Sequence, residues 1–491
     1  MRFLTDKLFA VVTLVCVLLG AERAGAQLTS LEVGKVYHFT NARYTEYALG
    51  VNADAQVRGV TPVNKADHNQ LWVVAEKDES GNFRLQSLGH GGFLQAKGQD
   101  GEWLLVDRSV TDDTYLVLDK TGNYNVFRGV NYNGGYGFAN VASGHNYKIL
   151  GWTHVNDLGS QWTIENISMD ESALNKALDK HAYSNNAIRD AVSTALTNLF
   201  ADAACTTPKK SVTMAELESD VDYQALTPTL RNMVKKVYGE AWAEKNYDNT
   251  KEDWGADYAK KYRVQWYEPY TEPECAAAAL RINAHSNLNN PTGIFANNGD
   301  VLFVMVEGEI KDGAHLYLSS YTGHNKLGGY DEGIALHTGL NVIPVTADGT
   351  NYCINYVVKT FDASQGTGKK AIVQGRELSA YPDLQIHIEG GHINGYWNKM
   401  GDDAAHNGDF NYLADTDSDW DYIKARATQT DVTVLGEYIT LQFPLTDAGT
   451  GDDKGMGTFF NSYNGKTTSL VSTIEEWDNV MIWERLLMGV V

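Results

Sequence analysis

The chain has 491 residues, of which 43% are hydrophobic and 21% are charged, as in folded globular proteins rather than disordered ones. This length is too great for one ordinary hydrophobic core, so several domains are expected. The net charge of −22 excludes the basic surface needed to bind nucleic acid or anionic lipid.

Residues 1–26 are predicted to be a signal peptide. Arg2 and Lys7 make its start positive, residues 8–20 form an apolar run too short to span a bilayer, and residues 24–26 are a small-residue cleavage site. The mature chain is therefore expected to be secreted or held at the cell surface. No later run is long or apolar enough to predict a membrane span.

Three cysteines follow the predicted cleavage site, namely Cys205, Cys275 and Cys353. Three are too few for a disulfide framework, and the sequence leaves open whether Cys275 pairs with Cys353.

Residues 27–168 contain a repeat with a period near 45 residues. An aromatic residue opens a short strand once in each copy, and an apolar residue opens a second strand out of phase with it. Short strands with frequent turns, in three copies, predict an all-β domain with pseudo-threefold symmetry. The recurring residues are Tyr47, Phe93 and Phe138, and then Trp72, Leu116 and Trp162.

Gln70-Leu71-Trp72 matches the Gln-x-Trp motif of ricin-type lectins, so this region resembles a degenerate ricin-type β-trefoil. The resemblance implies a carbohydrate-binding domain in which each copy can hold a shallow sugar site, and several weak sites add avidity. Candidate sugar-binding residues in the third copy are Asn140, His145 and Trp152. Trp72 and Trp162 are instead expected to be buried in the core.

Residues 169–271 change to the helical period and are expected to form a small helical linker or accessory domain. A break near Ser184 divides the first amphipathic pattern. Thr213 and Glu216 form a capping box, and Thr227-Pro228 starts another helix. Aromatic residues from Trp242 to Trp266 continue at spacings that a helix allows.

Residues 272–491 are expected to be β-rich and sandwich-like, which makes the whole chain multidomain α+β. The turn and strand from Asn290 to Phe295, the Leu384–Asn394 strand and turn, and the helix from Ile474 occur in an order that resembles the enhancin-like, mucin-degrading zinc metallopeptidases (peptidase family M-sixty). The resemblance implies a zinc cofactor and mucin-type glycoprotein substrates.

Catalysis in that family uses a His-Glu-x-x-His helix, in which two histidines bind zinc and the glutamate accepts a proton from zinc-bound water. None of the 13 histidines has this spacing, so the chain is expected to stop before the motif and to lack catalytic residues. Weak alternative metal ligands are His387, Glu389 and His392. Leu384–Glu389 alternates as a half-buried strand does, which puts His387 and Glu389 on an exposed face.

Two acidic clusters, residues 402–403 and 415–421, are expected to be solvated loops, with loop calcium as an alternative for the second. Three functions stay open. The first is the N-terminal part of a mucin-degrading peptidase carrying a glycan-binding trefoil, and the second is a non-enzymatic glycan-binding or adhesion protein. The third, a glycoside hydrolase, would need two carboxylates facing a sugar cleft, and no motif pairs them.

Overall fold

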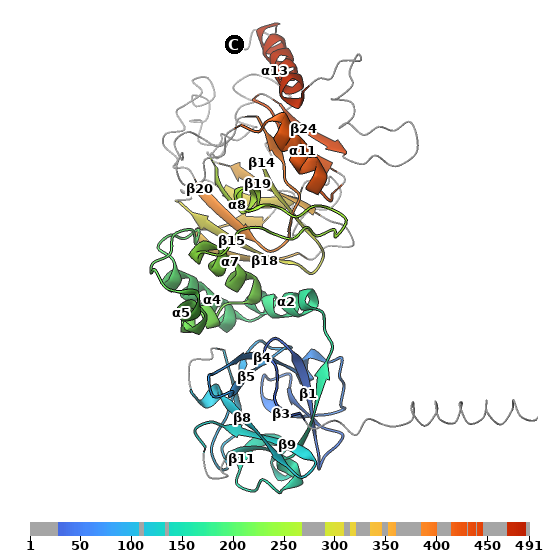
Figure 1. Cartoon of the computed structure of the whole chain (residues 1–491), viewed down its shortest axis with the longest axis vertical. Coiled ribbons are helices and arrows are strands. Elements are labelled where there is room, and N and C mark those ends of the chain that lie inside the picture. Colours follow the sequence, from blue (N-terminus) through green and yellow to red (C-terminus); the bar gives the residue numbers. More distant parts are fainter. Residues whose placement is uncertain are drawn as a thin grey trace, which may run out of the picture. The chain divides into compact units, whose positions relative to one another are not determined.

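The structure is a computed structural model, and its chain divides into two compact units, Met1–His181 with Asn185–Ala191, and Ala182–Ser184 with Val192–Val491. The predicted signal peptide, Cys275 and the first acidic cluster lie outside the described residues. The structure describes residues 28–107, 112–132, 137–267, 290–308, 315–320, 334–345, 352–359, 384–399, 414–429, 431–437, 439–444 and 469–487 (Figure 1).

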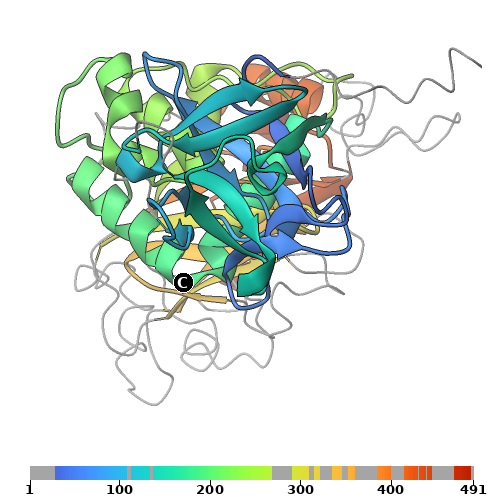
Figure 2. The same cartoon turned by 90° about the horizontal axis from the view of Figure 1, so that it is seen from below.

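The first unit is built from three copies of a four-strand motif. Six strands close a barrel through the antiparallel pairs β1–β4, β4–β5, β5–β8, β8–β9, β9–β12 and β12–β1. The other six form the hairpins β2–β3, β6–β7 and β10–β11, one in each copy (Figures 1 and 2). This is β-trefoil topology. The strands are β1 Val36–Asn41, β2 Ala48–Val51, β3 Val57–Val60, β4 Leu71–Lys77, β5 Phe83–Ser87, β6 Phe93–Gln95, β7 Leu104–Val106, β8 Leu116–Thr121, β9 Tyr124–Gly129, β10 Phe138–Ala142, β11 Lys148–Trp152 and β12 Trp162–Ile167.

The two motif tryptophans occupy equivalent places in the barrel core, as the sequence predicts. Trp72 and Trp162 are fully buried, and their indole N–H groups donate to the carbonyl oxygens of Leu49 at 2.9 Å and Ala139 at 3.0 Å. A buried indole needs such an acceptor, which makes these tryptophans structural. Leu49 in copy one is therefore equivalent to Ala139 in copy three.

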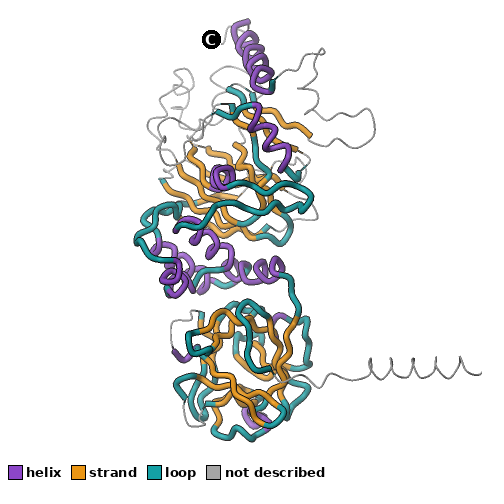
Figure 3. The backbone as a smooth tube through the Cα atoms, viewed as in Figure 1, coloured by secondary structure: helices purple, strands orange, loops and turns teal. Residues whose placement is uncertain are grey.

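Helices follow the barrel in the chain (Figure 3). In α2 (Glu171–Asp179), Leu174 and Leu178 belong to one hydrophobic cluster with Val36 of β1 and with Leu88, which follows β5. The predicted break near Ser184 separates α3 (His181–Ser184) from α4 (Asn186–Leu199), and the predicted capping box of Thr213 and Glu216 is present. The next helices are α5 Met214–Ser219, α6 Val221–Gln224, α7 Pro228–Tyr238 and α8 Ala256–Arg263.

The expected continuation of helix to Trp266 is wrong. Helix α8 ends at Arg263, and Val264–Tyr267 forms strand β13, which pairs antiparallel with β20 (Leu384–Glu389). The aromatic spacing fits both periods, and pairing with a strand more than a hundred residues away decided the outcome.

Two sheets of the second unit share one hydrophobic core, which contains Ile294, Val304 and Ile388. One sheet has the order β13-β20-β15-β18 and the other β17-β16-β19-β14-β21. The strands are β14 Asn290–Ala296, β15 Val301–Glu307, β16 His315–Ser320, β17 Ile334–Leu336, β18 Gly339–Pro344, β19 Tyr352–Lys359 and β21 His392–Ile393.

A smaller sheet and two helices share a further core around Trp397, Trp420 and Ile474. The expectation of a solvated loop at residues 415–421 is wrong, because α11 begins within it and Thr416 and Asp419 form a capping box. Among the described residues, no helix combines the length and the apolar character needed to cross a membrane. These elements are β22 Trp397–Asn398, β23 Asp431–Leu435, β24 Thr440–Pro444, α11 Asp417–Arg426 and α13 Leu470–Leu487.

Candidate functional site

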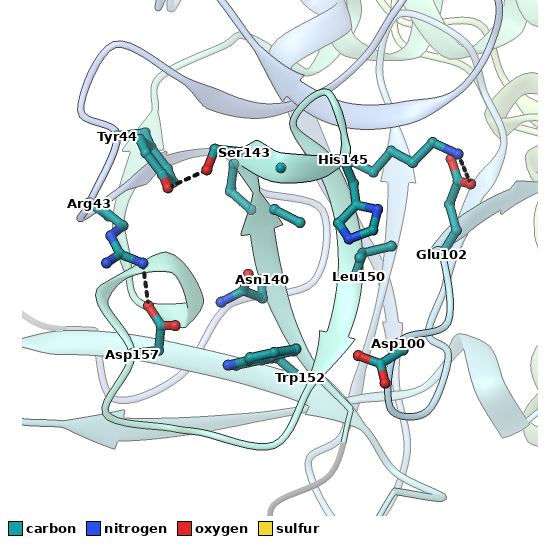
Figure 4. Close-up of a pocket in the computed structure, with 14 residues that line it drawn as sticks. Arg43, Tyr44, Asp100, Glu102, Asn140, Ser143, His145, Leu150, Trp152 and Asp157 are labelled. Carbon is teal, nitrogen blue, oxygen red and sulfur yellow. Dashed lines mark hydrogen bonds and ion pairs between the residues drawn. The ribbon is translucent and has the colours of Figure 1, made fainter.

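A pocket of about 470 Å³ lies over the β10–β11 hairpin of the third copy. It contains all three residues that the sequence selected, Asn140, His145 and Trp152 (Figure 4). Asn140 is on β10, Trp152 ends β11, and His145 is in the 3₁₀ turn between these strands. An aromatic face with a few polar groups around a concave space is the usual composition of a small-molecule site.

Asn140 is held in place by the turn that precedes the Trp162 strand. Its amide nitrogen donates to the Ser160 hydroxyl at 2.9 Å, and the residue is 7% exposed. Trp152 is half-buried, and its indole nitrogen has no hydrogen-bond partner among the residues that the structure describes. The asparagine is thus pre-oriented, and the tryptophan is partly exposed in the pocket.

Further residues that line the pocket come from copies one and two. The sequence did not predict them as part of this site. Arg43 and Tyr44 follow β1, and Asp100 and Glu102 lie between β6 and β7. The loop carrying Asp100 approaches β11 so closely that a Cβ at Gly151 would lie 2.1 Å from the Gly98 carbonyl oxygen. A glycine at position 151 is the local sequence feature that this close contact with Gly98 requires.

Two ion pairs line the pocket. Arg43 lies 3.2 Å from Asp157, and the Lys148 ammonium lies 2.5 Å from Glu102 (Figure 4). Asp157 also accepts a hydrogen bond from the Gly159 N–H, which caps the 3₁₀ turn Leu158–Ser160. Tyr44 donates to the Ser143 hydroxyl at 2.8 Å.

Copies one and two lack this combination at the equivalent positions. The equivalence of Leu49 with Ala139 puts Gly50 in the place of Asn140, and the strand register puts Val60 in the place of Trp152. Val60 also fills the space, because a Cβ at Gly50 would lie 2.8 Å from its Cγ2. In copy two the corresponding residues are Gln95 and Val106. The tryptophan-and-asparagine pocket therefore occurs once in the described part of the trefoil. A site with this pair of residues is not repeated in copies one and two.

The weak metal candidates lie in the second unit and have other partners. His387 Nδ1 is 2.9 Å from the Ala204 carbonyl oxygen, and its Nε2 is 3.2 Å from Glu389 Oε1. His392 lies 3.8 Å from Asp300 and 4.2 Å from the centre of the Tyr247 ring. Both ring nitrogens of His387 face oxygen acceptors, whereas a zinc ligand needs a nitrogen lone pair directed at the metal. No group of three His, Cys, Asp or Glu residues within the described ranges could hold a metal ion, so these residues do not fit the zinc that the family resemblance implies.

Strand β20 is buried on both faces, so the expectation of an exposed His387–Glu389 face is wrong. The exposed fractions are 0% for His387 and 3% for Glu389. Glu389 lies 3.9 Å from both Lys236 of α7 and Arg263 of α8. Arg263 also donates to both carboxylate oxygens of Glu244, at 3.0 and 2.9 Å. These four charged residues and His387 form a charge network, called here the buried charge network, in which only the side chains of Lys236 and Glu244 are partly exposed, at 14% and 16%.

The network is expected to make the second unit sensitive to acid. Burial alone would raise the pKa of Glu244, but the Arg263 and Lys236 charges outweigh it and lower the pKa from 4.5 to about 2. The pKa of Glu389 is lowered for the same reason. A depressed carboxyl pKa stabilises the fold above pH 4.5, and this stabilisation is lost as the pH falls towards 2.

We expect the loss to be on the order of 3 kcal/mol for Glu244, which unfolding of the second unit in denaturant from pH 6 to pH 2 would measure. Glu244→Gln should lower stability at pH 6 and flatten its dependence on pH. An unchanged pH profile in that variant would contradict the assignment.

No protein-family model and no curated protein matches the chain. Among solved structures, a metallopeptidase from Bacteroides thetaiotaomicron matches 61% of this chain and 41% of its own, with 21% identity and a TM-score of 0.39. A metallopeptidase in complex with Tn antigen matches 48% of this chain and 36% of its own, with 22% identity and a TM-score of 0.32. A Macrolepiota procera ricin B-like lectin in complex with lactose matches 28% of this chain and 100% of its own, with 16% identity and a TM-score of 0.24. The chain thus spans 41% and 36% of the two metallopeptidase structures.

Proposed function

We propose that this protein binds glycans through the pocket of its third trefoil copy. The observation that carries the proposal is that Asn140, His145 and Trp152 face one pocket, with the Trp152 ring partly exposed inside it. A sugar ring has apolar C–H faces that pack on an aromatic ring, and its hydroxyl groups can bond to the amide and the imidazole. The signal peptide predicted for residues 1–26 would direct the chain to a secreted or cell-surface location, where glycoproteins are available partners.

The test is binding of the full chain to a glycan array, followed by calorimetric titration with the best glycan. Because the described residues place the tryptophan-and-asparagine pair in copy three alone, we expect one site per chain. Three equivalent sites per chain would contradict this assignment of the pocket. Failure to bind any glycan would contradict the proposed function.

We propose further that the second unit is related to the N-terminal part of mucin-degrading metallopeptidases. The support is the order of the sequence motifs, together with the pairing of two of them: Ile294 and Phe295 of β14 lie opposite Ile393 and His392 of β21. In this reading the trefoil holds the protein on a glycosylated substrate and raises its local concentration. A non-enzymatic adhesion protein is the alternative, since the same pocket would serve it.

Because the 491 residues contain no His-Glu-x-x-His motif, we expect the purified chain to leave mucin intact. The measurement is gel analysis of mucin incubated with the chain and zinc, with a chelator-treated sample as control. Cleavage that the chelator abolishes would show that this chain has a metal site of its own.

A further inference from the structure

The cationic side chains of the pocket already have carboxylate partners. Arg43 pairs with Asp157 and Lys148 pairs with Glu102, while Asp100 has no ion-pair partner in the part of the chain that the structure describes. These five charged groups therefore leave one uncompensated negative charge. Figure 4 shows the Asp100 carboxylate at the Trp152 end of the pocket.

Asp100 is held at this place by its backbone. Its φ is +59°, in the left-handed region, and its N–H donates to the Gly151 carbonyl oxygen at 2.7 Å. The return bond from the Gly151 N–H to the Gly101 carbonyl oxygen is 2.9 Å long. Two hydrogen bonds thus attach the Asp100 loop to the strand that carries Trp152, so the carboxylate belongs to the pocket although it comes from another copy.

We propose that the pocket discriminates against sugars that carry a carboxylate, and that Asp100 is the residue that determines this selectivity. The inference rests on the glycan binding proposed above. The carboxylate of an acidic sugar is repelled by the Asp100 carboxylate. It can form an ion pair with Arg43 or Lys148 only by displacing Asp157 or Glu102. A neutral sugar meets neither obstacle, and an amino sugar gains an attraction to Asp100.

The test uses probes that differ at one carbon. The 6-amino-6-deoxy derivative, the parent methyl galactoside and the methyl galacturonide carry a positive, a neutral and a negative group at C6, and the corresponding glucosides form a second series. At low salt we expect affinity to fall in that order, by about threefold to tenfold for each change of charge, as for two charges several ångströms apart in water. The differences should shrink in high salt, which screens such interactions.

Asp100→Asn is the matched variant, because asparagine keeps the size of the side chain and tolerates positive φ. It should bring the affinities for the uronide and the neutral sugar close together. Asp54→Asn makes the same charge change outside the pocket and should leave their ratio unchanged.

Three results overturn the proposal: a uronide that binds as tightly as the neutral sugar, a ratio that Asp100→Asn does not alter, or a ratio that Asp54→Asn alters equally. Absence of binding to both sugar series and to the glycan array would instead overturn the proposed function, and this inference with it.

Discussion

Replacing Trp152 with alanine is expected to weaken glycan binding by at least about 30-fold, which for a weak lectin site means loss of measurable binding. The ring supplies the apolar surface of the pocket on which a sugar face would pack. Its indole nitrogen makes no hydrogen bond within the described part of the chain and the residue is half-buried, so its removal should affect binding more than folding. Calorimetric titration with the best glycan from the array would measure the effect.

Two variants separate loss of the sugar surface from general damage. Trp152→Tyr retains a flat ring and should recover part of the affinity. Trp483→Ala removes a tryptophan that is 65% exposed on α13 of the second unit and should leave binding unchanged. Unaltered binding by Trp152→Ala, with an unchanged melting temperature, would place the sugar site elsewhere.

Replacing Arg263 with methionine is expected to destabilise the second unit by about 3–5 kcal/mol. Arg263 is 4% exposed and forms ion pairs with Glu244 and Glu389. Its guanidinium also donates a hydrogen bond of 2.6 Å to the carbonyl oxygen of Gly390. Methionine fills similar volume but leaves the buried carboxylate of Glu389 and the partly buried carboxylate of Glu244 with Lys236 as their shared cation. Calorimetric unfolding of the full chain, which should resolve the transition of the second unit, is the measurement.

Lys424→Met is the surface control, because its partner Asp421 is 75% exposed and such pairs contribute about 0–1 kcal/mol. Adding Glu244→Gln to the Arg263 variant should restore part of the stability, since it removes one uncompensated charge. Equal losses for Arg263→Met and Lys424→Met would show that the buried charge network contributes little.

Several local features could be predicted because they depend on neighbours in the sequence. The three-copy period predicts the trefoil, and the capping box at Thr213 predicts the start of α5, since a cap needs only residues three apart. Asn140, His145 and Trp152 could be selected together because one hairpin carries them. The prediction of a loop at residues 415–421 is wrong because Thr416 and Asp419 form the capping box of α11.

By itself, the sequence determined the trefoil repeat, the two core tryptophans and the hairpin that carries three pocket residues. Only the tertiary structure decided the other walls and their charge. Arg43 comes from another copy of the repeat and lines the pocket only in the closed barrel, and the Asp100 loop is brought there by the contact at Gly151. It also decided that His387 and Glu389 are buried. A period of two residues separates the faces of a strand, but what covers each face depends on chain segments as distant as Lys236 and Ala204.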